Sequence, residues 1–390
     1  MAPFRDKRIF LDYASGTPTS PHVLRAMREL EDHFHNPSAI YKEGQIAKEE
    51  VSRSRRDIAR ILGARESGII FTSGGTESDN LAILGTFSAC EFAKPHLITS
   101  PIEHHAILET VKEVSRRGGE VSFADVSEVG LVSPQSVEKL LRPETFLVSI
   151  GLANGEIGTI QDVSKIGRII RAYRKEKNSP YPYFHVDLGI SPNYLPVDLD
   201  RLHADLLTLD GGKIYGPKGV GVLALRHGVK INPIIFGGGQ EGGKRSGTLN
   251  LPAIKGLSEA LMDVEKKREG ESERAKILQD YFLQSIESMS KDIVINTPKT
   301  GALPCIVSVS LPGTLSEFLA LKLDRLGVLA SVGSACSADG LVSGSHVMRE
   351  IGKGELAEST LRFSFGRGTR KRDLDSALQR FSLVIKHDKI

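Results

Sequence analysis

The stretch Leu209-Asp-Gly-Gly-Lys-Ile-Tyr-Gly-Pro-Lys-Gly219 places a lysine in a glycine-rich turn. Apolar runs typical of buried strands flank this turn, at residues 204–209 and 220–225. A turn between two such strands presents an amine at the edge of a sheet, so Lys213 is a candidate Schiff-base lysine. For an isolated Gly-Lys pair, the alternative is a solvated lysine in a polar turn.

A carboxylate ends the strand pattern that precedes this stretch. Asp187 closes the run Tyr183-Phe-His-Val-Asp187. An aspartate here can lie against a pyridinium nitrogen while Lys213 holds an aldehyde carbon. These are the two protein groups that pyridoxal phosphate chemistry requires, and together they predict pyridoxal 5'-phosphate as the cofactor.

The composition is typical of a soluble enzyme. A chain of 390 residues, 40% hydrophobic and 25% charged, can bury a large core, and its length suggests two domains or one large one. The net charge of +3 gives no indication of nucleic-acid binding. No stretch approaches the length of a membrane span, and residues 1–8 lack the apolar core of a signal peptide. We therefore expect a cytoplasmic protein.

Strand and helix patterns alternate through the first half of the chain, which predicts an α/β fold whose mostly parallel sheet carries its site at the strand ends. The strands are expected at 69–72, 96–99, 120–123 and 146–150, and the helices at 81–92, 106–116 and 134–141. After Gly247 the pattern changes to long charged helices, at 254–283, 316–326 and 371–386. We expect a large domain at 15–255, and a smaller α+β domain made of 1–14 and 256–390.

The segment Ser73-Gly-Gly-Thr-Glu-Ser-Asp-Asn80 follows the first of these strands and precedes a helix. Gly75 lets the backbone amides approach an anion, Thr76 adds a hydroxyl, and a helix N-terminus favours negative charge. These features predict a phosphate-binding turn. An ordinary strand-to-helix turn, capped by Ser73 or Thr76, is the alternative.

The three cysteines differ in their surroundings, and none has the spacing of a metal site or of a disulfide framework. Cys90 falls in an apolar helix pattern and Cys305 begins an apolar strand, so both are expected to pack in the interior. Cys336 lies in the small-residue stretch Ser331-Val-Gly-Ser-Ala-Cys-Ser-Ala-Asp-Gly340, which is typical of a mobile loop. A reactive thiol is therefore plausible at Cys336, although reactivity depends on a lowered pKa.

The whole chain resembles the cysteine desulfurases of the NifS/IscS-like group. These are pyridoxal-phosphate enzymes of the aspartate-aminotransferase fold, with a seven-stranded, mostly parallel sheet. The motifs that carry the resemblance are Leu11-Asp-Tyr13, Phe71-Thr-Ser-Gly-Gly-Thr-Glu-Ser-Asp-Asn80, Glu103-His104, Asn154, Glu156-Ile-Gly158, His185-Val-Asp187, Lys213-Ile-Tyr-Gly-Pro-Lys-Gly219, Arg245-Ser-Gly-Thr248, Gly333-Ser-Ala-Cys336 and Arg362-Phe-Ser-Phe-Gly366. The Gly-Ser-Ala-Cys form of the loop is similar to the branch that hands sulfur to scaffold and carrier proteins.

The resemblance implies a role for each motif. Lys213 would hold the cofactor and move the Cα proton, and Asp187 would keep the ring nitrogen protonated. His104 would stack on the ring and exchange protons, while Cys336 would attack the sulfur of L-cysteine. The products would be a persulfide on the enzyme and L-alanine. The remaining implied contacts are Gly75 and Thr76 to the cofactor, Asn154 to the cofactor and substrate, Arg362 to the substrate carboxylate, and Thr248 to the phosphate from the second subunit of a homodimer.

The chain departs from the family around the lysine. The family usually has serine and histidine where this chain has Asp210 and Gly212, glutamine at Ile190 and asparagine at Gly155. Each of these normally helps to hold the cofactor. The alternative to a working desulfurase is therefore a weakly active or inactive homodimer that binds sulfur-transfer partners. A desulfurase-like enzyme with another substrate, such as selenocysteine, is a third hypothesis.

Overall fold

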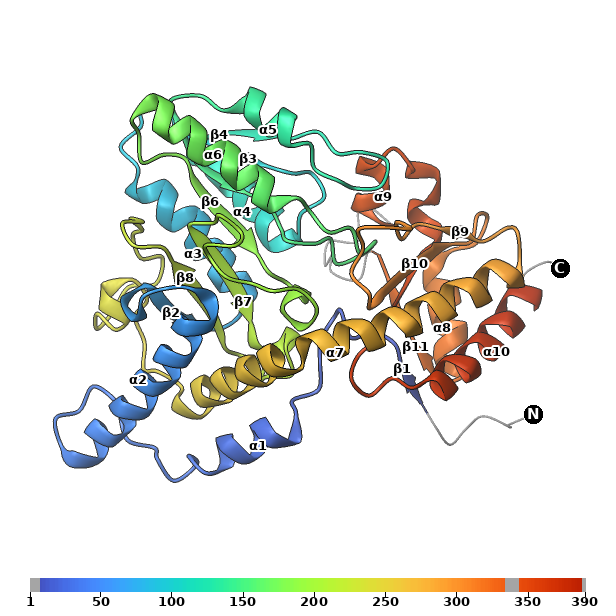
Figure 1. Cartoon of the computed structure of the whole chain (residues 1–390), viewed down its shortest axis with the longest axis horizontal. Coiled ribbons are helices and arrows are strands. Elements are labelled where there is room, and N and C mark those ends of the chain that lie inside the picture. The colour runs from blue at the N-terminus through green and yellow to red at the C-terminus, as the bar shows by residue number, and fades with distance from the viewer. Residues whose placement is uncertain (1–7, 334–343, 388–390) are drawn as a thin grey trace.

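The computed structural model describes residues 8–333 and 344–387, and a seven-stranded sheet forms its centre (Figure 1). All neighbouring strands run parallel except β8, which is antiparallel to both of its neighbours. The predicted α/β fold with a mostly parallel sheet is therefore confirmed. The strands, in spatial order, are β2 (Ile69–Thr72), β8 (Gly221–Leu225), β7 (Leu206–Asp210), β6 (Tyr183–Asp187), β5 (Thr145–Ser149), β3 (His96–Thr99) and β4 (Glu120–Phe123).

Helices cover both faces of this sheet. Successive side chains of a strand point to opposite faces, so Ile70 packs in the cluster with α3 and α4, whereas Phe71 packs in the cluster with α2, α6 and α7. Burial on both faces explains why most of the strands are continuous apolar runs. The helices around the sheet are α1 (Pro21–Arg28), α2 (Lys42–Leu62), α3 (Gly75–Ala89), α4 (His105–Arg116), α5 (Pro134–Leu140), α6 (Val163–Lys177) and α7 (Leu251–Met289).

Helix α3 begins six residues before the position expected from sequence, and it ends at Ala89 instead of residue 92. Gly74 precedes it with φ 152° and ψ −172°, a conformation that favours glycine. One turn later, Glu77 Oε2 accepts a hydrogen bond from the Ser73 amide at 2.8 Å, in the manner of a capping box. The segment predicted as a turn is therefore largely the first part of a helix.

A second, antiparallel sheet has its own core. Its strands are β12 (Ser331–Val332), β13 (Thr360–Ser364), β10 (Ile306–Ser310) and β9 (Val294–Ile295), while β1 (Ile9–Phe10) pairs with β11 (Val328–Leu329). Phe282 packs edge-on against Phe363 and Phe365, with ring centroids 5.2 and 5.3 Å apart. The helices here are α8 (Ser316–Arg325), α9 (His346–Glu350) and α10 (Lys371–His387).

Helix α7 runs from the seven-stranded sheet to the second sheet (Figure 1). Its 39 residues include position 255, so the boundary expected from sequence falls inside one continuous helix and stays a prediction. In the parts of the chain that the structure describes, no helix combines the length and apolar content needed to cross a membrane. Short 3₁₀ turns complete the fold: η1 (Glu66–Gly68), η2 (Ser191–Asn193), η3 (Gly211–Lys213), η4 (Glu241–Gly243) and η5 (Gly354–Ser359).

Candidate active site

A cavity of about 240 Å³ lies where the carboxyl ends of the central strands face the second sheet. In an open α/β sheet this edge is where ligands bind. The structure brings most of the predicted site residues into this one cavity, namely Gly75, Thr76, His104, Asn154, Asp187, Lys213 and Arg362. Thr248 instead lines a separate cavity of about 110 Å³ beside Ser73, and Cys336 lies outside the described residues.

Lys213 ends the short turn η3, directly after strand β7. Its Nζ donates hydrogen bonds to the carbonyl oxygens of Ala14, at 2.9 Å, and Ser15, at 2.8 Å. The Asn193 side chain donates to the Lys213 carbonyl oxygen at 2.8 Å and holds the backbone in place. The amine is therefore positioned at the cavity wall by segments that are far apart in sequence.

Asp187 ends strand β6, next to β7, so the sequence-based prediction that it lies near Lys213 at neighbouring strand ends is confirmed. Its Oδ1 accepts a hydrogen bond from the Gly189 amide at 3.0 Å. Burial raises the pKa of Asp187, and Asp210 adds to the rise, while His104 and Lys213 oppose it. A cationic ring nitrogen placed against this carboxylate would favour its ionised form.

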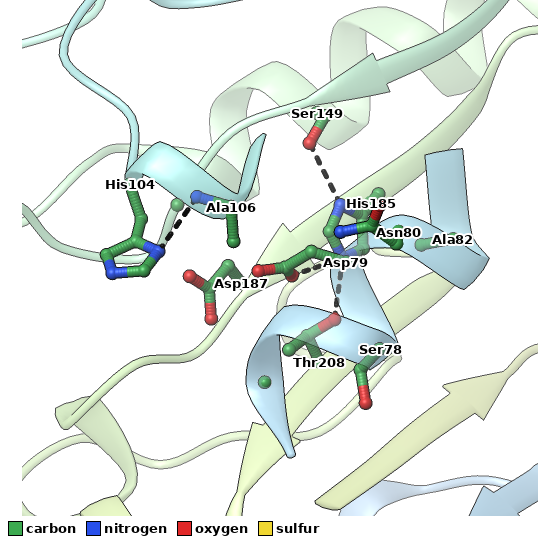
Figure 2. Close-up of polar contacts among 12 residues, drawn as sticks. Ser78, Asp79, Asn80, Ala82, His104, Ala106, Ser149, His185, Asp187 and Thr208 are labelled. Carbon is green, nitrogen blue, oxygen red and sulfur yellow. Dashed lines mark hydrogen bonds and ion pairs between the residues drawn. The ribbon is translucent and has the colours of Figure 1, made fainter. Parts of the chain in front are cut away.

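Asp79 is a buried acid in the same cavity that the sequence analysis did not single out. It lies beside His185, whose Nε2 is 3.7 Å from Asp79 Oδ1 (Figure 2). Burial raises the pKa of Asp79 well above its ordinary value, with Asp187 adding to the rise, and burial lowers the pKa of His185 to about 3. His185 is therefore neutral near pH 7, and burial favours the protonated form of Asp79.

His104 caps helix α4 and opens onto the cavity. Its Nδ1 accepts a hydrogen bond from the Ala106 amide at 3.1 Å, so the proton of the neutral ring is assigned to Nε2. The surrounding protein lowers the pKa of His104 by desolvation, and Lys213 and His105 lower it further, whereas Asp187 raises it. A neutral imidazole with a protonated Nε2 can donate a proton or a hydrogen bond.

Arg362 reaches the cavity from strand β13 of the second sheet. Its guanidinium donates to Asp12 Oδ1 at 2.7 Å, to Ser15 Oγ at 2.6 Å and to the Gly155 carbonyl oxygen at 2.9 Å. Its Nε is buried and finds no hydrogen-bond partner among the described residues. A planar fork of this kind suits a carboxylate ligand.

The Asn154 side chain joins two loops by hydrogen bonds, a structural role that the sequence analysis did not predict. Its Oδ1 accepts hydrogen bonds from the amides of Glu156 and Ile157, at 2.9 and 3.0 Å, and its Nδ2 donates to the Ile102 carbonyl oxygen at 3.0 Å. These contacts hold the loop after β5 against the loop after β3. One N–H of the side-chain amide remains for a ligand in the cavity.

Both other cysteines were expected to pack in the interior, and this holds for Cys305 but not fully for Cys90. Cys305 is fully buried, and burial raises the pKa of its thiol to about 12. Cys90 is only partly buried, because it is the residue after the last turn of α3 and not inside the helix. Its Sγ donates to the Phe87 carbonyl oxygen at 3.1 Å.

Comparison with known proteins identifies the family. The model of the aminotransferase class-V family matches residues 9–377. The chain belongs to the aminotransferase class-V family. A cysteine desulfurase IscS from Dictyoglomus turgidum is 39% identical over 382 residues, which cover 97% of this chain and 95% of that protein.

Solved structures of NifS-like proteins and related enzymes have the same fold as this chain. A NifS-like protein superposes with a TM-score of 0.90 at 31% identity, over 97% of this chain and 100% of the other. SspA in complex with cysteine superposes with a TM-score of 0.79 at 35% identity, over 92% of this chain and 98% of the other. The prediction that the chain is a member of the cysteine desulfurases is confirmed, and these relatives support an enzyme over a non-catalytic platform. The family depends on pyridoxal 5'-phosphate.

The residues around the cavity suit the aldehyde and the ring nitrogen of that cofactor, but they leave fewer contacts for its phosphate. Lys213 and Asp187, the groups that would hold an aldehyde and a ring nitrogen, line the same cavity, and Asp79 Oδ1 is buried at its wall with no hydrogen-bond partner among the described residues. At the phosphate end, however, the Gly75 amide donates to Asp210 Oδ2 at 3.2 Å. Ile190 and Gly155 supply no polar side chain, since Ile190 is apolar and packs in an apolar cluster, and glycine has no side chain; the space beside Gly155 is open.

Proposed function

We propose that this protein is a cysteine desulfurase that removes sulfur from L-cysteine and carries it as a persulfide on Cys336. The observation that carries the proposal is the convergence of Lys213, Asp187 and Arg362 on one cavity. SspA, with 35% identity, has been solved in complex with cysteine, which supports cysteine as the substrate. Pyridoxal 5'-phosphate, when bound, supplies an electron sink for charge developing at the substrate Cα.

Separate side chains of this protein bind the substrate, bind the cofactor and transfer protons. Arg362 binds the substrate carboxylate through its planar fork, and Asp12 and Ser15 fix the orientation of that fork. Lys213 would hold the cofactor through its aldehyde, and its amine would move the proton of the substrate Cα. Asp187 would hold the cofactor at its ring nitrogen, where a carboxylate favours the protonated form of that nitrogen.

Proton and sulfur transfer complete the reaction. His104, with its proton on Nε2, exchanges protons with the substrate beside Lys213. The Cys336 thiolate forms a bond to the substrate sulfur, and the bond between that sulfur and the substrate Cβ breaks. Its electron pair stays on the carbon side and takes up a proton, so L-alanine leaves and no external oxidant is needed.

The proposal extends to the protein's surroundings. The protein works in the cytoplasm as a homodimer, in which Thr248 of one subunit reaches the cofactor phosphate of the other. This placement is supported by Thr248 lying outside the cavity of its own subunit. The persulfide passes to an iron-sulfur scaffold or another sulfur acceptor. Light scattering on the purified protein tests the homodimer, and a monomer would contradict it.

An absorption spectrum of the purified protein with pyridoxal 5'-phosphate, followed by L-cysteine, tests the reaction. We expect a band near the visible edge that requires Lys213 and changes on adding cysteine, with alanine and a persulfide on Cys336 as the products. Lys213→Ala should lack the band, and Cys336→Ser should keep the band but form no persulfide. If wild type shows no Lys213-dependent band at high cofactor concentration, the protein is a binding platform and not a desulfurase.

A further inference from the structure

The predicted phosphate-binding turn already holds a carboxylate of the chain itself. Asp210, the last residue of β7, accepts a hydrogen bond from the Gly75 amide at 3.2 Å through Oδ2. Through Oδ1 it accepts another from the Gly212 amide at 2.7 Å. An anion is thus seated at the N-terminus of α3, where backbone amides and the helix dipole favour negative charge.

The contact is close on more than one side. A Cβ atom added to Gly75 would lie 3.2 Å from Asp210 Oδ2, and one added to Gly74 would lie 3.8 Å from the same oxygen. The carboxylate therefore packs against both glycines that would surround a phosphate. A phosphate group that used the Gly75 amide would have to displace Asp210 or lie beside it.

The charges around the cavity do not compensate for a second anion. Among the described residues that line it are five acidic side chains, and burial raises the pKa of four of them, Asp79, Glu103, Glu156 and Asp187, which favours their neutral forms. The strongly basic side chains among these lining residues are Lys213, which would bind the aldehyde, and Arg362. Arg362 is already paired with Asp12, at 2.7 Å. The acids are Asp79, Glu103, Glu156, Asp187 and Asp210.

We propose that Asp210 is a cofactor-specificity residue that lowers the preference of this site for the 5'-phosphate, so that phosphate-free pyridoxal and pyridoxal 5'-phosphate bind with similar affinities. The proposal rests on the proposed function, because it takes Lys213 as the group that binds the aldehyde. Two like charges about 4 Å apart weaken binding by roughly fivefold under full water screening, and by several hundredfold at the effective dielectric near a protein surface. The effect falls on the phosphate alone.

Asp210 also has a structural role, because its bond to Gly212 caps the turn η3 that carries Lys213. Loss of that cap would disturb Lys213 and would weaken pyridoxal and pyridoxal 5'-phosphate alike. The ratio of the two dissociation constants separates the roles, because only repulsion of the phosphate changes the ratio.

The test is a titration of the full chain, stripped of cofactor, with each compound in turn, followed by the Lys213-dependent absorption band. The variants are Asp210→Ser, which restores the residue usual in the family, and Asp210→Asn, which removes the charge at nearly constant shape. Glu138→Gln, on the exposed side of α5 and outside the cavity lining, is the charge-matched control, and Lys213→Ala gives the background.

In Asp210→Ser and Asp210→Asn, the affinity for pyridoxal 5'-phosphate relative to that for pyridoxal is expected to rise about tenfold or more over wild type, and this ratio should not change in Glu138→Gln. An unchanged ratio in both Asp210 variants overturns the proposal. So does a weaker affinity for pyridoxal 5'-phosphate alone, because it would show that Asp210 helps to hold the phosphate. Absence of the band with both compounds in wild type would overturn the proposed function instead.

Discussion

Glu103 gives the most quantitative prediction. Its carboxylate is buried beside the cavity, where Oε1 accepts from Ser100 Oγ at 2.5 Å and Oε2 from the Gly151 amide at 2.9 Å. Burial raises the pKa of Glu103 to about 7, and the two hydrogen bonds only partly oppose the rise. The perturbation is Glu103→Gln, which keeps the shape and removes the ionisation.

The direction in which the unfolding free energy changes with pH follows from proton binding to the folded and unfolded chains. Below about pH 4.5 both the folded and the unfolded chain hold the proton, and between about pH 4.5 and 7 only the folded chain does. The stability that Glu103 contributes is therefore present at low pH and is lost as the pH rises through this window. A rise from the ordinary 4.5 to about 7 corresponds to about 3 kcal/mol of unfolding free energy. The glutamine side chain in the variant does not ionise, so it contributes no such pH dependence.

The assay is urea unfolding of wild type and Glu103→Gln, at fixed cofactor loading, from about pH 5 to about pH 8. Relative to wild type, the variant is expected to gain about 2–3 kcal/mol as the pH rises across this range. Glu109→Gln, at an exposed pair with Lys112, serves as the control and should show no such change. A difference between wild type and Glu103→Gln that is constant with pH would refute the reasoning.

Three further predictions concern packing and charge. Gly366→Ala places a Cβ atom 2.1 Å from Cδ1 of the buried Tyr13 ring, so we expect a loss of about 2 kcal/mol or more; an unchanged melting temperature would contradict this. Arg362→Lys loses the planar fork, so the KM for cysteine should rise about tenfold while the Lys213-dependent band is retained; an equal KM would show that Arg362 does not bind the carboxylate. Arg245→Ala leaves Glu77 without the ion pair that, with the Ser73 bonds, lowers its pKa against the effect of burial. A loss of about 3 kcal/mol is expected by urea unfolding, and Glu77→Gln in the same background should recover part of it.

The local patterns account for the elements and for part of the site. The central strands were predictable because their side chains are buried on both faces, and parallel strands place their carboxyl ends at one edge. For this reason the sequence could predict that Asp187 and Lys213 lie at neighbouring strand ends. The start of α3 could not, because Gly74 signals a turn and the capping contact of Glu77 depends on side-chain direction.

The surroundings of Asp79 could not be predicted from the sequence either. Asp79 stands in the polar segment 73–80, where a turn was expected, and the sequence does not say which neighbours surround its carboxylate. Its raised pKa comes from burial and from Asp187, which is more than 100 residues away in the chain. The pKa of Asp79 therefore depends on tertiary contacts that its position in the motif does not show.

The sequence by itself determined the fold class and the placement of Lys213 and Asp187 at neighbouring strand ends, since both depend on local pattern and on strand order. Only the tertiary structure decided that Ala14 and Ser15 hold the lysine, that Arg362 arrives from the second sheet, and that Asp210 occupies the Gly75 amide. These contacts join segments 135 to 207 residues apart in the chain. Such contacts depend on how two sheets and their side chains pack, and local propensity carries no information about that packing.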